Sequence, residues 1–292
     1  MSWPVVVNLR LPLRVPLGGS RWRSVTLVEG PSGWGETSPL PGYPCDPAAS
    51  WAAADEAAFG TWPPAVRQRV AVNVLVPAVG PDEAAALARG ASDVKVKVGD
   101  GGLGGDVDRV AAVRNAVGPG GRIRVDANEA WDVEQAVAAV AVLARYGVEL
   151  VEQPVPTLAD LAEVRRRVAV PVAADECVRS VDDARELARL DAADAVVLKV
   201  QPLGGVVAAL AVADAAGVPA IVTSMYESSV GLAAGLALAA ALPDLPWACG
   251  LGTASLFAAD VVADPLLPVD GVLTARRPVP DPALLARYSV GG

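Results

Sequence analysis

The sequence predicts an α/β fold: a (β/α)7β TIM-like barrel that follows an N-terminal α+β capping domain, which the C-terminal tail completes. Two observations support this prediction. From about residue 73, short β-branched runs that end in polar residues alternate with Ala-rich segments of helical spacing. Charged residues also lie near the C-terminal ends of four successive runs, at intervals of 26, 23 and 24 residues: Asp126, Glu152, Asp175 and Lys199. The C-terminal ends of barrel strands meet at one rim, where the active sites of this fold are found.

The chain divides into three predicted parts. Residues 1–72 are expected to form the capping domain, because the alternating stretch 21–30 precedes a Pro- and Gly-rich loop and an Ala-rich helical stretch. Residues 73–255 are expected to form the barrel, in which seven helices separate eight strands. The predicted strands are 73–79, 93–98, 122–128, 148–154, 171–176, 195–200, 219–225 and 247–252. Residues 256–292 contain five prolines and are expected to pack back on the capping domain.

Composition excludes several classes of protein. The 292 residues are 53% apolar, which is enough to bury a large core, and the net charge of -9 argues against binding to a nucleic-acid backbone. The longest uncharged apolar run, 230–242, is too short to span a membrane. Charges and prolines interrupt the N-terminal segment, so no secretion signal is expected. The three cysteines form no C-x-x-C pair and indicate a reducing compartment, so a cytoplasmic location is expected.

The counts of histidine, arginine and lysine restrict which side chains can transfer protons in this protein. The chain has no histidine, which excludes the Ser-His-Asp and Cys-His catalytic arrangements. Its 24 cationic residues are 21 arginines and three lysines, Lys95, Lys97 and Lys199. The lysine amine can lose its proton near neutral pH, whereas the arginine guanidinium cannot. In a chain this rich in arginine, lysine is therefore expected only where arginine cannot replace it. Proton transfer in this protein therefore falls to carboxylates, lysine, tyrosine or cysteine.

The lysines form the first candidate group. On a strand, residues two apart share a face, so Lys95 and Lys97 point the same way, into the barrel mouth if the intervening valines meet the helices. Two close ammonium groups repel each other, which lowers the pKa of at least one of them. An edge strand with both lysines in water is the alternative. Lys199 stands alone in an apolar strand across the mouth, where a buried charge is costly unless it is paired or functional.

The carboxylates form the second group. Asp126, Glu152 and Asp175 come from three consecutive strands, and three converging oxygen ligands suit an octahedral Mg²⁺. Each carboxylate taken singly is also compatible with a helix N-cap. Asp175 and Glu176 are adjacent and are expected to face opposite sides, so the sequence does not decide which of them faces a metal.

Substrate contacts are predicted from the same rim. Arg124 shares a face with Asp126, and its guanidinium suits a substrate carboxylate, although a structural ion pair is the alternative. The segments 223–229 and 248–253 bring small residues, Ser224 and Gly250 among them, whose backbone N–H groups can approach a ligand. The expected partner is thus a small-molecule carboxylate.

Taken together, these motifs resemble those of the enolase superfamily, in the muconate-lactonizing-like subgroup that carries catalytic lysines on both sides of the barrel. The motifs are K-x-K at 95–97, D-A-N at 126–128, V-E-Q-P at 151–154, A-D-E at 174–176 and L-K at 198–199. The loop GWGETSPLPGY extends the resemblance into the N-terminal domain. Within the superfamily the segments 124–131, 224–232 and 248–253 are most similar to the o-succinylbenzoate synthases. The segment 17–25 departs from the Phe-containing loop of that subgroup, so closure over a substrate would involve Arg21 or Trp22 differently.

The resemblance implies a reaction and roles for the residues. It implies Mg²⁺, with Mn²⁺ as a possible substitute, on Asp126, Glu152 and Asp175. The implied activity is dehydration of 2-succinyl-6-hydroxy-2,4-cyclohexadiene-1-carboxylate in menaquinone biosynthesis. In this scheme Lys97 is the base and then the acid, Lys95 tunes Lys97, and Lys199 stabilises the enediolate as a cation. Arg124, Ser224 and Gly250 are the implied substrate contacts.

Other functions remain open at the level of the sequence. An N-succinylamino acid racemase or dipeptide epimerase would use the same lysines to remove and return a proton. A Schiff-base aldolase would use Lys199 as a nucleophile. A catalytically silent barrel that binds a small acid is a further alternative. The acidic charge neither requires nor excludes a homo-oligomer.

Overall fold

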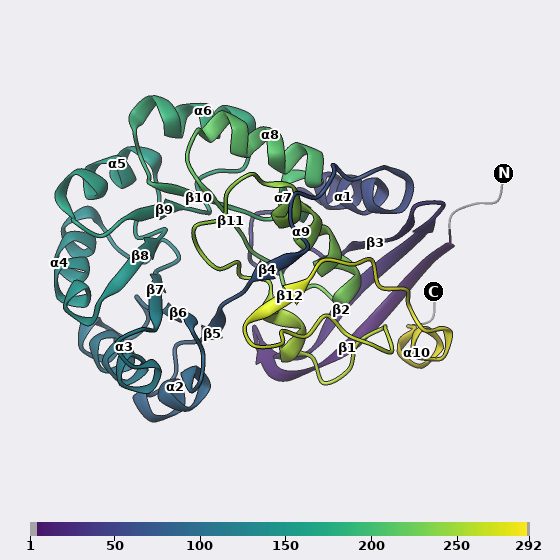
Figure 1. Cartoon of the computed structure of the whole chain (residues 1–292), viewed down its shortest axis with the longest axis horizontal. Coiled ribbons are helices and arrows are strands. Elements are labelled where there is room, and N and C mark those ends of the chain that lie inside the picture. Colours follow the sequence, from purple (N-terminus) through teal and green to yellow (C-terminus); the bar gives the residue numbers. More distant parts are fainter. Residues whose placement is uncertain (1–4, 291–292) are drawn as a thin grey trace.

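A curved parallel sheet forms the wall of the barrel (Figure 1). The computed structural model describes residues 5–290. Seven strands follow one another in the order β11-β10-β9-β8-β7-β6-β5. Their bounds are β5 (Val74–Val76), β6 (Asp93–Lys97), β7 (Arg122–Asp126), β8 (Val148–Glu152), β9 (Val172–Ala174), β10 (Ala195–Leu198) and β11 (Ala220–Val222). The predicted α/β barrel is therefore confirmed, and each of the first seven predicted strands contains one of these.

Helices alternate with the strands, and Figure 1 shows most of them on the outer side of the sheet. They are α2 (Pro81–Ala88), α3 (Leu103–Val117), α4 (Val133–Leu143), η1 (Ala144–Tyr146), α5 (Leu158–Arg167), α6 (Val181–Leu190), α7 (Val200–Leu203), α8 (Val206–Ala216) and α9 (Ser229–Ala241). Side-chain caps fix several starts: Asp132 caps α4 in a capping box with Gln135, and Thr157 and Ser180 cap α5 and α6. The short helix α7 was not predicted, and it begins directly after Lys199.

The eighth predicted strand is wrong as a regular strand. Instead, two isolated parallel bridges, Val72 to Cys249 and Thr223 to Gly250, join this stretch to the start and the end of the sheet. The pairing stops there because the chain turns into the 3₁₀ helix η2 (Gly252–Leu256). A side chain at Gly250 would not fit, since a Cβ would lie 2.3 Å from Thr223 Oγ1. The ring thus closes through two bridges rather than a full strand.

A three-stranded antiparallel sheet precedes the barrel. Its strands are β1 (Val5–Leu17), β2 (Ser20–Gly30) and β3 (Gly33–Thr37), and the helix α1 (Pro47–Phe59) packs on it. Gly18 and Gly19 both have positive φ and connect β1 to β2 in a two-residue turn. The segment 17–25 is therefore a tight hairpin rather than a loop. Trp22 lies there beside the Arg10 guanidinium, with the Arg10 Cζ 5.5 Å from the centre of the Trp22 ring.

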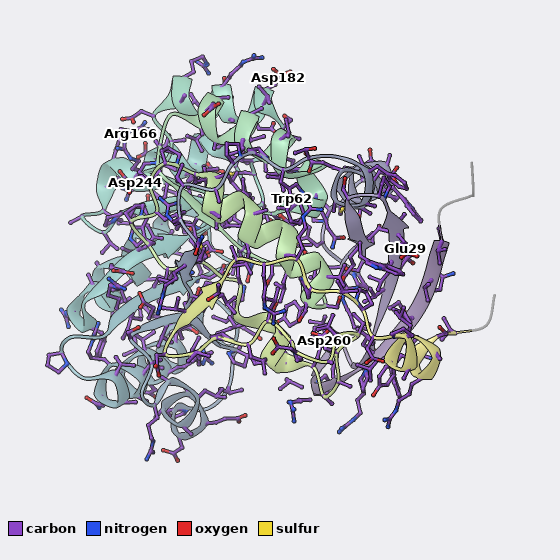
Figure 2. All side chains as sticks on the ribbon, turned by 45° about the vertical axis from the view of Figure 1, so that its right-hand side comes forward. Glu29, Trp62, Arg166, Asp182, Asp244 and Asp260 are labelled. Carbon is purple, nitrogen blue, oxygen red and sulfur yellow. The ribbon has the colours of Figure 1, made fainter. Side chains whose placement is uncertain are left out.

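The C-terminal segment contacts both the N-terminal sheet and the stretch that precedes the barrel. Its strand β12 (Val272–Thr274) pairs with β4 (Arg69–Ala71), and its helix α10 (Pro282–Tyr288) packs on β1. The carboxylate of Asp260 accepts hydrogen bonds from the backbone N–H and hydroxyl of Ser229 at the start of α9. The Arg277 guanidinium lies 3.5 Å from the centre of the Trp62 ring. Figure 2 labels Asp260 and Trp62 and shows the side chains around them. Among residues 5–290, no helix is both long and apolar enough to cross a membrane.

A buried carboxylate joins the N-terminal sheet to the barrel. Glu36 on β3 accepts hydrogen bonds from the Ser38 hydroxyl over 2.7 Å, from the Ser228 backbone N–H over 3.2 Å and from the Gly231 backbone N–H over 3.1 Å. Burial, together with the nearby charge of Glu227, raises the pKa of Glu36 to about 7 against these hydrogen bonds. The two parts of the molecule therefore meet at a group that titrates near neutral pH.

We expect this group to make stability depend on pH. Its pKa is about 7 in the folded protein and near its ordinary value of 4.5 in the unfolded chain, so the folded state binds more protons between these values. The free energy of unfolding should fall as pH rises through this window, with up to about 3 kcal/mol from Glu36. Urea unfolding at a series of pH values measures this slope. The Glu36→Gln variant should have a flatter profile between pH 4.5 and 7, and a slope equal to that of the unmodified protein would refute the assignment.

Candidate active site

A cavity of about 430 Å³ opens at the C-terminal ends of the barrel strands. The barrel contributes charged and polar side chains to it: Lys95, Lys97, Asp126, Asn128, Asp175, Glu176 and Lys199. Apolar side chains, among them Leu75, Leu87 and Leu256, line it as well. Leu40 and Tyr43 reach it from the stretch between β3 and α1, which we call the cap segment (residues 38–46). This lining suits a small molecule with anionic and apolar parts.

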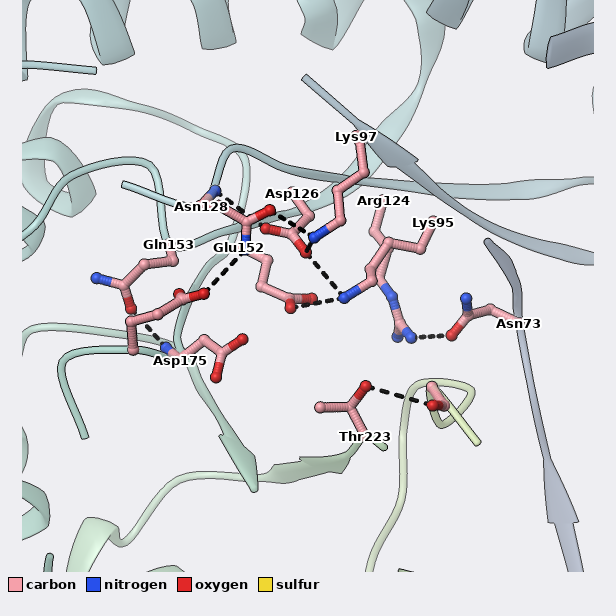
Figure 3. Close-up of polar contacts among 12 residues, drawn as sticks. Asn73, Lys95, Lys97, Arg124, Asp126, Asn128, Glu152, Gln153, Asp175 and Thr223 are labelled. Carbon is pink, nitrogen blue, oxygen red and sulfur yellow. Dashed lines mark hydrogen bonds and ion pairs between the residues drawn. The ribbon is translucent and has the colours of Figure 1, made fainter. Parts of the chain in front are cut away.

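Lys95 lies between two carboxylates (Figure 3). Its Nζ donates to Asp126 Oδ2 over 2.9 Å and to Glu152 Oε1 over 2.8 Å. Lys97 Nζ donates to the same Asp126 Oδ2 over 2.5 Å and also to the side-chain oxygen of Asn128. The valines between and beside the two lysines belong to the core beneath the outer helices. Strand alternation thus brings both lysines to the cavity, as the sequence predicted.

The two lysines differ in exposure. The Lys97 side chain is 28% exposed and the Lys95 side chain 9%, so Lys97 is the more accessible to a bound molecule. Burial lowers the pKa of Lys95, but the charges of Asp126 and Glu152 outweigh burial and hold it above its usual value. Lys95 is therefore a cation, and the lowering of pKa expected from two neighbouring ammonium groups does not occur at Lys95.

Lys199 approaches the cavity from the other side. It follows β10, which is separated from β6 by three strands, so Lys97 and Lys199 face each other across the mouth. Its Nζ donates to Asp175 Oδ1 and to the Tyr43 hydroxyl, the latter over 3.1 Å. Burial lowers the pKa of Lys199, but Asp175, Tyr43 and Glu176 together outweigh burial and hold this pKa above its usual value. Lys199 is thus a second fixed cation.

Asp175 and Glu176 both line the cavity, so the expectation that they face opposite sides is wrong. The strand β9 ends at Ala174, and strand alternation therefore does not apply to either residue. Asp175 pairs with Lys199, whereas Glu176 Oε1 accepts a hydrogen bond from Asn128 Nδ2 over 2.8 Å.

The backbone is strained where the strands end. Asn128, Glu129, Gln153 and Tyr226 have positive φ, and all follow barrel strands. Such conformations are costly for residues with side chains and tend to occur at functional sites. Gln153 also makes a contact between strands: its side-chain Oε1 accepts a hydrogen bond from the Asp175 backbone N–H over 2.6 Å. Gln153 thus links the ends of β8 and β9.

The three predicted substrate contacts occupy different positions. Ser224 and Gly250 line the cavity, and the Ser224 hydroxyl donates to the Gly250 carbonyl over 2.9 Å. Arg124 is 3% exposed and is absent from the lining. Its guanidinium donates to the Ala248 carbonyl over 2.6 Å and to the side-chain oxygen of Asn73 (Figure 3). The structure therefore brings Ser224 and Gly250 to the cavity and leaves Arg124 beneath it. Arg21 and Trp22 are likewise outside the lining.

Some residues in the cavity wall and directly beneath it were missed by sequence reasoning. Tyr43 belongs to a loop whose reach across to the barrel has no local signal. Gln153 and Asn128 lie inside the motifs V-E-Q-P and D-A-N, so their position beside two predicted metal ligands was a usable signal.

The carboxylates fit a divalent cation. In residues 5–290 no three His, Cys, Asp or Glu side chains lie close enough together to hold a metal ion. The carboxylates form ion pairs with Lys95, Lys97 and Lys199 instead. However, Asp126, Glu152 and Asp175 are each at most 3% exposed, and Glu152 Oε2 has no hydrogen-bond partner among the described residues. Burial and the charges of Asp126 and Asp175 raise the pKa of Glu152, which indicates an excess of negative charge. A hard cation with oxygen ligands would relieve it.

Two family models match this chain. One, described as "Enolase C-terminal domain-like", matches residues 81–281, and the other, "Enolase N-terminal domain-like", matches residues 6–58. The chain therefore belongs to the enolase superfamily.

The curated relatives are more specific. An o-succinylbenzoate synthase of Thermobifida fusca is 55% identical over 272 residues, which are 91% of this chain and 86% of the relative. The o-succinylbenzoate synthases of Mycobacterium marinum and Mycobacterium tuberculosis are 50% identical over 282 residues, or 94% of this chain and 85% of each relative.

Solved structures share the fold at lower identity. A 2-chloromuconate cycloisomerase from Rhodococcus opacus has a TM-score of 0.87 at 24% identity and covers 99% of both chains. A muconate cycloisomerase from Pseudomonas fluorescens has a TM-score of 0.86 at 23% identity, with 99% of this chain and 98% of that chain covered. An N-succinyl Arg/Lys racemase from Bacillus cereus has a TM-score of 0.83 at 22% identity and covers 98% and 97%. Enzymes with different names therefore share this architecture.

Proposed function

We propose that this chain is a hydro-lyase that dehydrates 2-succinyl-6-hydroxy-2,4-cyclohexadiene-1-carboxylate to o-succinylbenzoate. The observation that carries the proposal is the placement of Lys97 and Lys199 on opposite sides of one cavity, with buried carboxylates on the strands between them. The names of relatives at 50–55% identity support this substrate. The reaction class follows, since loss of water from a cyclohexadiene leaves an aromatic ring.

The lysines divide the proton chemistry. Lys97 removes the proton next to the substrate carboxylate, because it is the most accessible of the three amines. The resulting ammonium then returns this proton to the departing hydroxide, which leaves as water. Lys95, held as a cation by two carboxylates, sets the electrostatic surroundings of Lys97. Lys199 remains a cation and stabilises the enediolate from the other side.

The three buried carboxylates are the proposed metal ligands. Asp126, Glu152 and Asp175 would hold Mg²⁺, with Mn²⁺ as a substitute, and the ion would act as a Lewis acid on the substrate carboxylate. Before the ion binds, Lys95 pairs with Asp126 and Glu152, and Lys199 pairs with Asp175, which holds these carboxylates in place. Ser224 and Gly250 would contact the substrate. Arg124 would support the site from beneath, because its guanidinium donates to two protein groups and not into the cavity.

We also propose a pathway, a cellular location and a domain division for the enzyme. The product belongs to menaquinone biosynthesis, and we place the enzyme in the cytoplasm with a small-molecule carboxylate as its partner. We also divide the chain into a capping domain (1–72), a catalytic barrel (73–255) and a C-terminal segment (256–292) that packs on the cap.

The test compares this reaction with its rivals on one preparation. With Mg²⁺ the protein should dehydrate the cyclohexadiene substrate, and EDTA should abolish turnover until the metal is restored. N-succinylamino acids incubated with the protein in deuterium oxide should keep their α-hydrogen, whereas a racemase would exchange it in both enantiomers. Borohydride should trap no adduct on Lys199. Activity that persists in EDTA, together with a trapped adduct, would favour the aldolase instead.

A further inference from the structure

The cap segment makes a direct contact with a charged group of the barrel. The Tyr43 hydroxyl accepts a hydrogen bond from Lys199 Nζ over 3.1 Å, and the same Nζ lies 4.5 Å from the centre of the Tyr43 ring. Tyr43 therefore meets this ammonium group through both its oxygen and its ring. Tyr43 is the sole side chain besides Asp175 that bonds Lys199 Nζ in the described residues.

The cap segment is held to the barrel near Lys199. Gln201, two residues after Lys199, accepts a hydrogen bond from the Ser38 backbone N–H over 2.8 Å and another from the Ser50 hydroxyl over 2.8 Å. Gln201 is 4% exposed and lies on α7, the short helix that Lys199 begins. The start of the cap segment is thus fixed to the same turn that carries Lys199.

A second anchor joins the cap segment to the neighbouring loop. Arg23 on β2 is buried, and its guanidinium donates to the Pro39 carbonyl over 3.1 Å. It also donates to the carbonyls of Met225 and Tyr226, each over 3.1 Å, in the loop after β11. Because its first residues are anchored on two sides, the cap segment has a defined path to Tyr43.

The contact with Tyr43 restricts the movement of the Lys199 side chain. The strand β10 ends at Leu198, so the backbone ladder stops one residue before Lys199. Asp175 binds the ammonium group from one side only, and a long flexible side chain with one partner can swing away from a substrate. The aromatic ring and hydroxyl of Tyr43 restrict it from the cap side.

We propose that Tyr43 is a positioning residue that holds the Lys199 ammonium in place for the reaction. The inference rests on the proposed function and adds a residue outside the barrel to the site. It also gives the N-terminal part a role in catalysis, although its hairpin tip is absent from the cavity lining. Tyr43 acts through Lys199, so its loss should lower kcat more than it raises KM.

The test uses two substitutions of different severity. Tyr43→Leu removes both the ring and the hydroxyl and should lower kcat for dehydration by roughly 10- to 100-fold. Tyr43→Phe keeps the ring, and we expect it to recover a substantial part of that loss. Tyr146→Phe is the matched control, because Tyr146 lies on η1 away from the cavity lining, and its kcat and KM should equal those of the unmodified protein. Thermal unfolding of each variant separates a folding defect from a catalytic one.

The outcomes separate this inference from the proposed function. If the unmodified protein does not dehydrate the substrate, the proposed function fails before Tyr43 is tested. If it does, and Tyr43→Leu remains folded with unchanged kcat, the positioning role is wrong. A rise in KM alone is equally contrary, since it would leave Tyr43 as a cavity-lining residue with no effect on Lys199. A kcat that falls for Tyr43→Leu and partly returns for Tyr43→Phe supports the inference.

Discussion

Replacement of Lys97 by alanine is expected to lower the dehydration rate by about 10³-fold or more while the protein remains folded. General base catalysis by one positioned group contributes this order of rate enhancement, and the chain has no histidine to replace the amine. Lys97 makes its hydrogen bonds through a side chain that is 28% exposed, so its loss costs little packing. Steady-state assays with Mg²⁺, together with circular dichroism and thermal unfolding, measure both effects.

Arginine substitutions separate a base from a fixed cation. Lys97→Arg keeps the charge but cannot lose a proton, so it should be as inactive as Lys97→Ala. Lys199→Arg keeps the cation that the enediolate needs and should be clearly more active than Lys199→Ala. Equal activity of Lys97→Arg and the unmodified protein would contradict the assignment of Lys97 as the base.

The second large effect concerns the carboxylates. Glu152→Gln removes one buried negative charge without changing the shape of the side chain, and we expect both Mg²⁺ binding and turnover to be lost, the latter by roughly 10³-fold. In the unmodified protein, Mg²⁺ should raise the midpoint of thermal unfolding, because a ligand that binds only the folded state stabilises it. The Glu152→Gln variant should show no such rise.

A control lies on the same strand. Glu149→Gln is the same substitution three residues earlier on β8, and Glu149, unlike Glu152, forms no ion pair with Lys95. Its response to Mg²⁺ should equal that of the unmodified protein. In the absence of metal, Glu152→Gln removes a charge that burial disfavours but also a partner of Lys95, so its own metal-free midpoint is the baseline for its Mg²⁺ response. A full Mg²⁺ response in Glu152→Gln would exclude Glu152 as a ligand.

Much of the barrel was predictable because its signals are local. Seven β-branched runs became β5 to β11, and the alternation of Lys95 and Lys97 with valines placed both amines at the cavity. The same local rule failed where the backbone leaves the strand. It separated Asp175 from Glu176, although β9 ends before both, and it made a strand of 247–252 where two bridges suffice.

The remaining errors depend on distant contacts. Arg124 shares a strand face with Asp126, yet its partners come from residues 73 and 248, which no local pattern reveals. The contact of Tyr43 with Lys199 joins residues 156 positions apart. The turn at Gly18 and Gly19 was readable from its glycines, but the reach of the hairpin was not. Local patterns thus predicted which side of the barrel carries the cavity and its lysines, whereas the contribution of the N-terminal part required the folded chain.

The measurement that tests the central claim most directly is turnover of 2-succinyl-6-hydroxy-2,4-cyclohexadiene-1-carboxylate by the purified protein with Mg²⁺, followed by absorbance. The predicted result is formation of o-succinylbenzoate at a rate of about 1 s⁻¹ or faster, with loss of this activity in Lys97→Ala. A folded, Mg²⁺-loaded protein that forms no o-succinylbenzoate from this substrate would contradict the account.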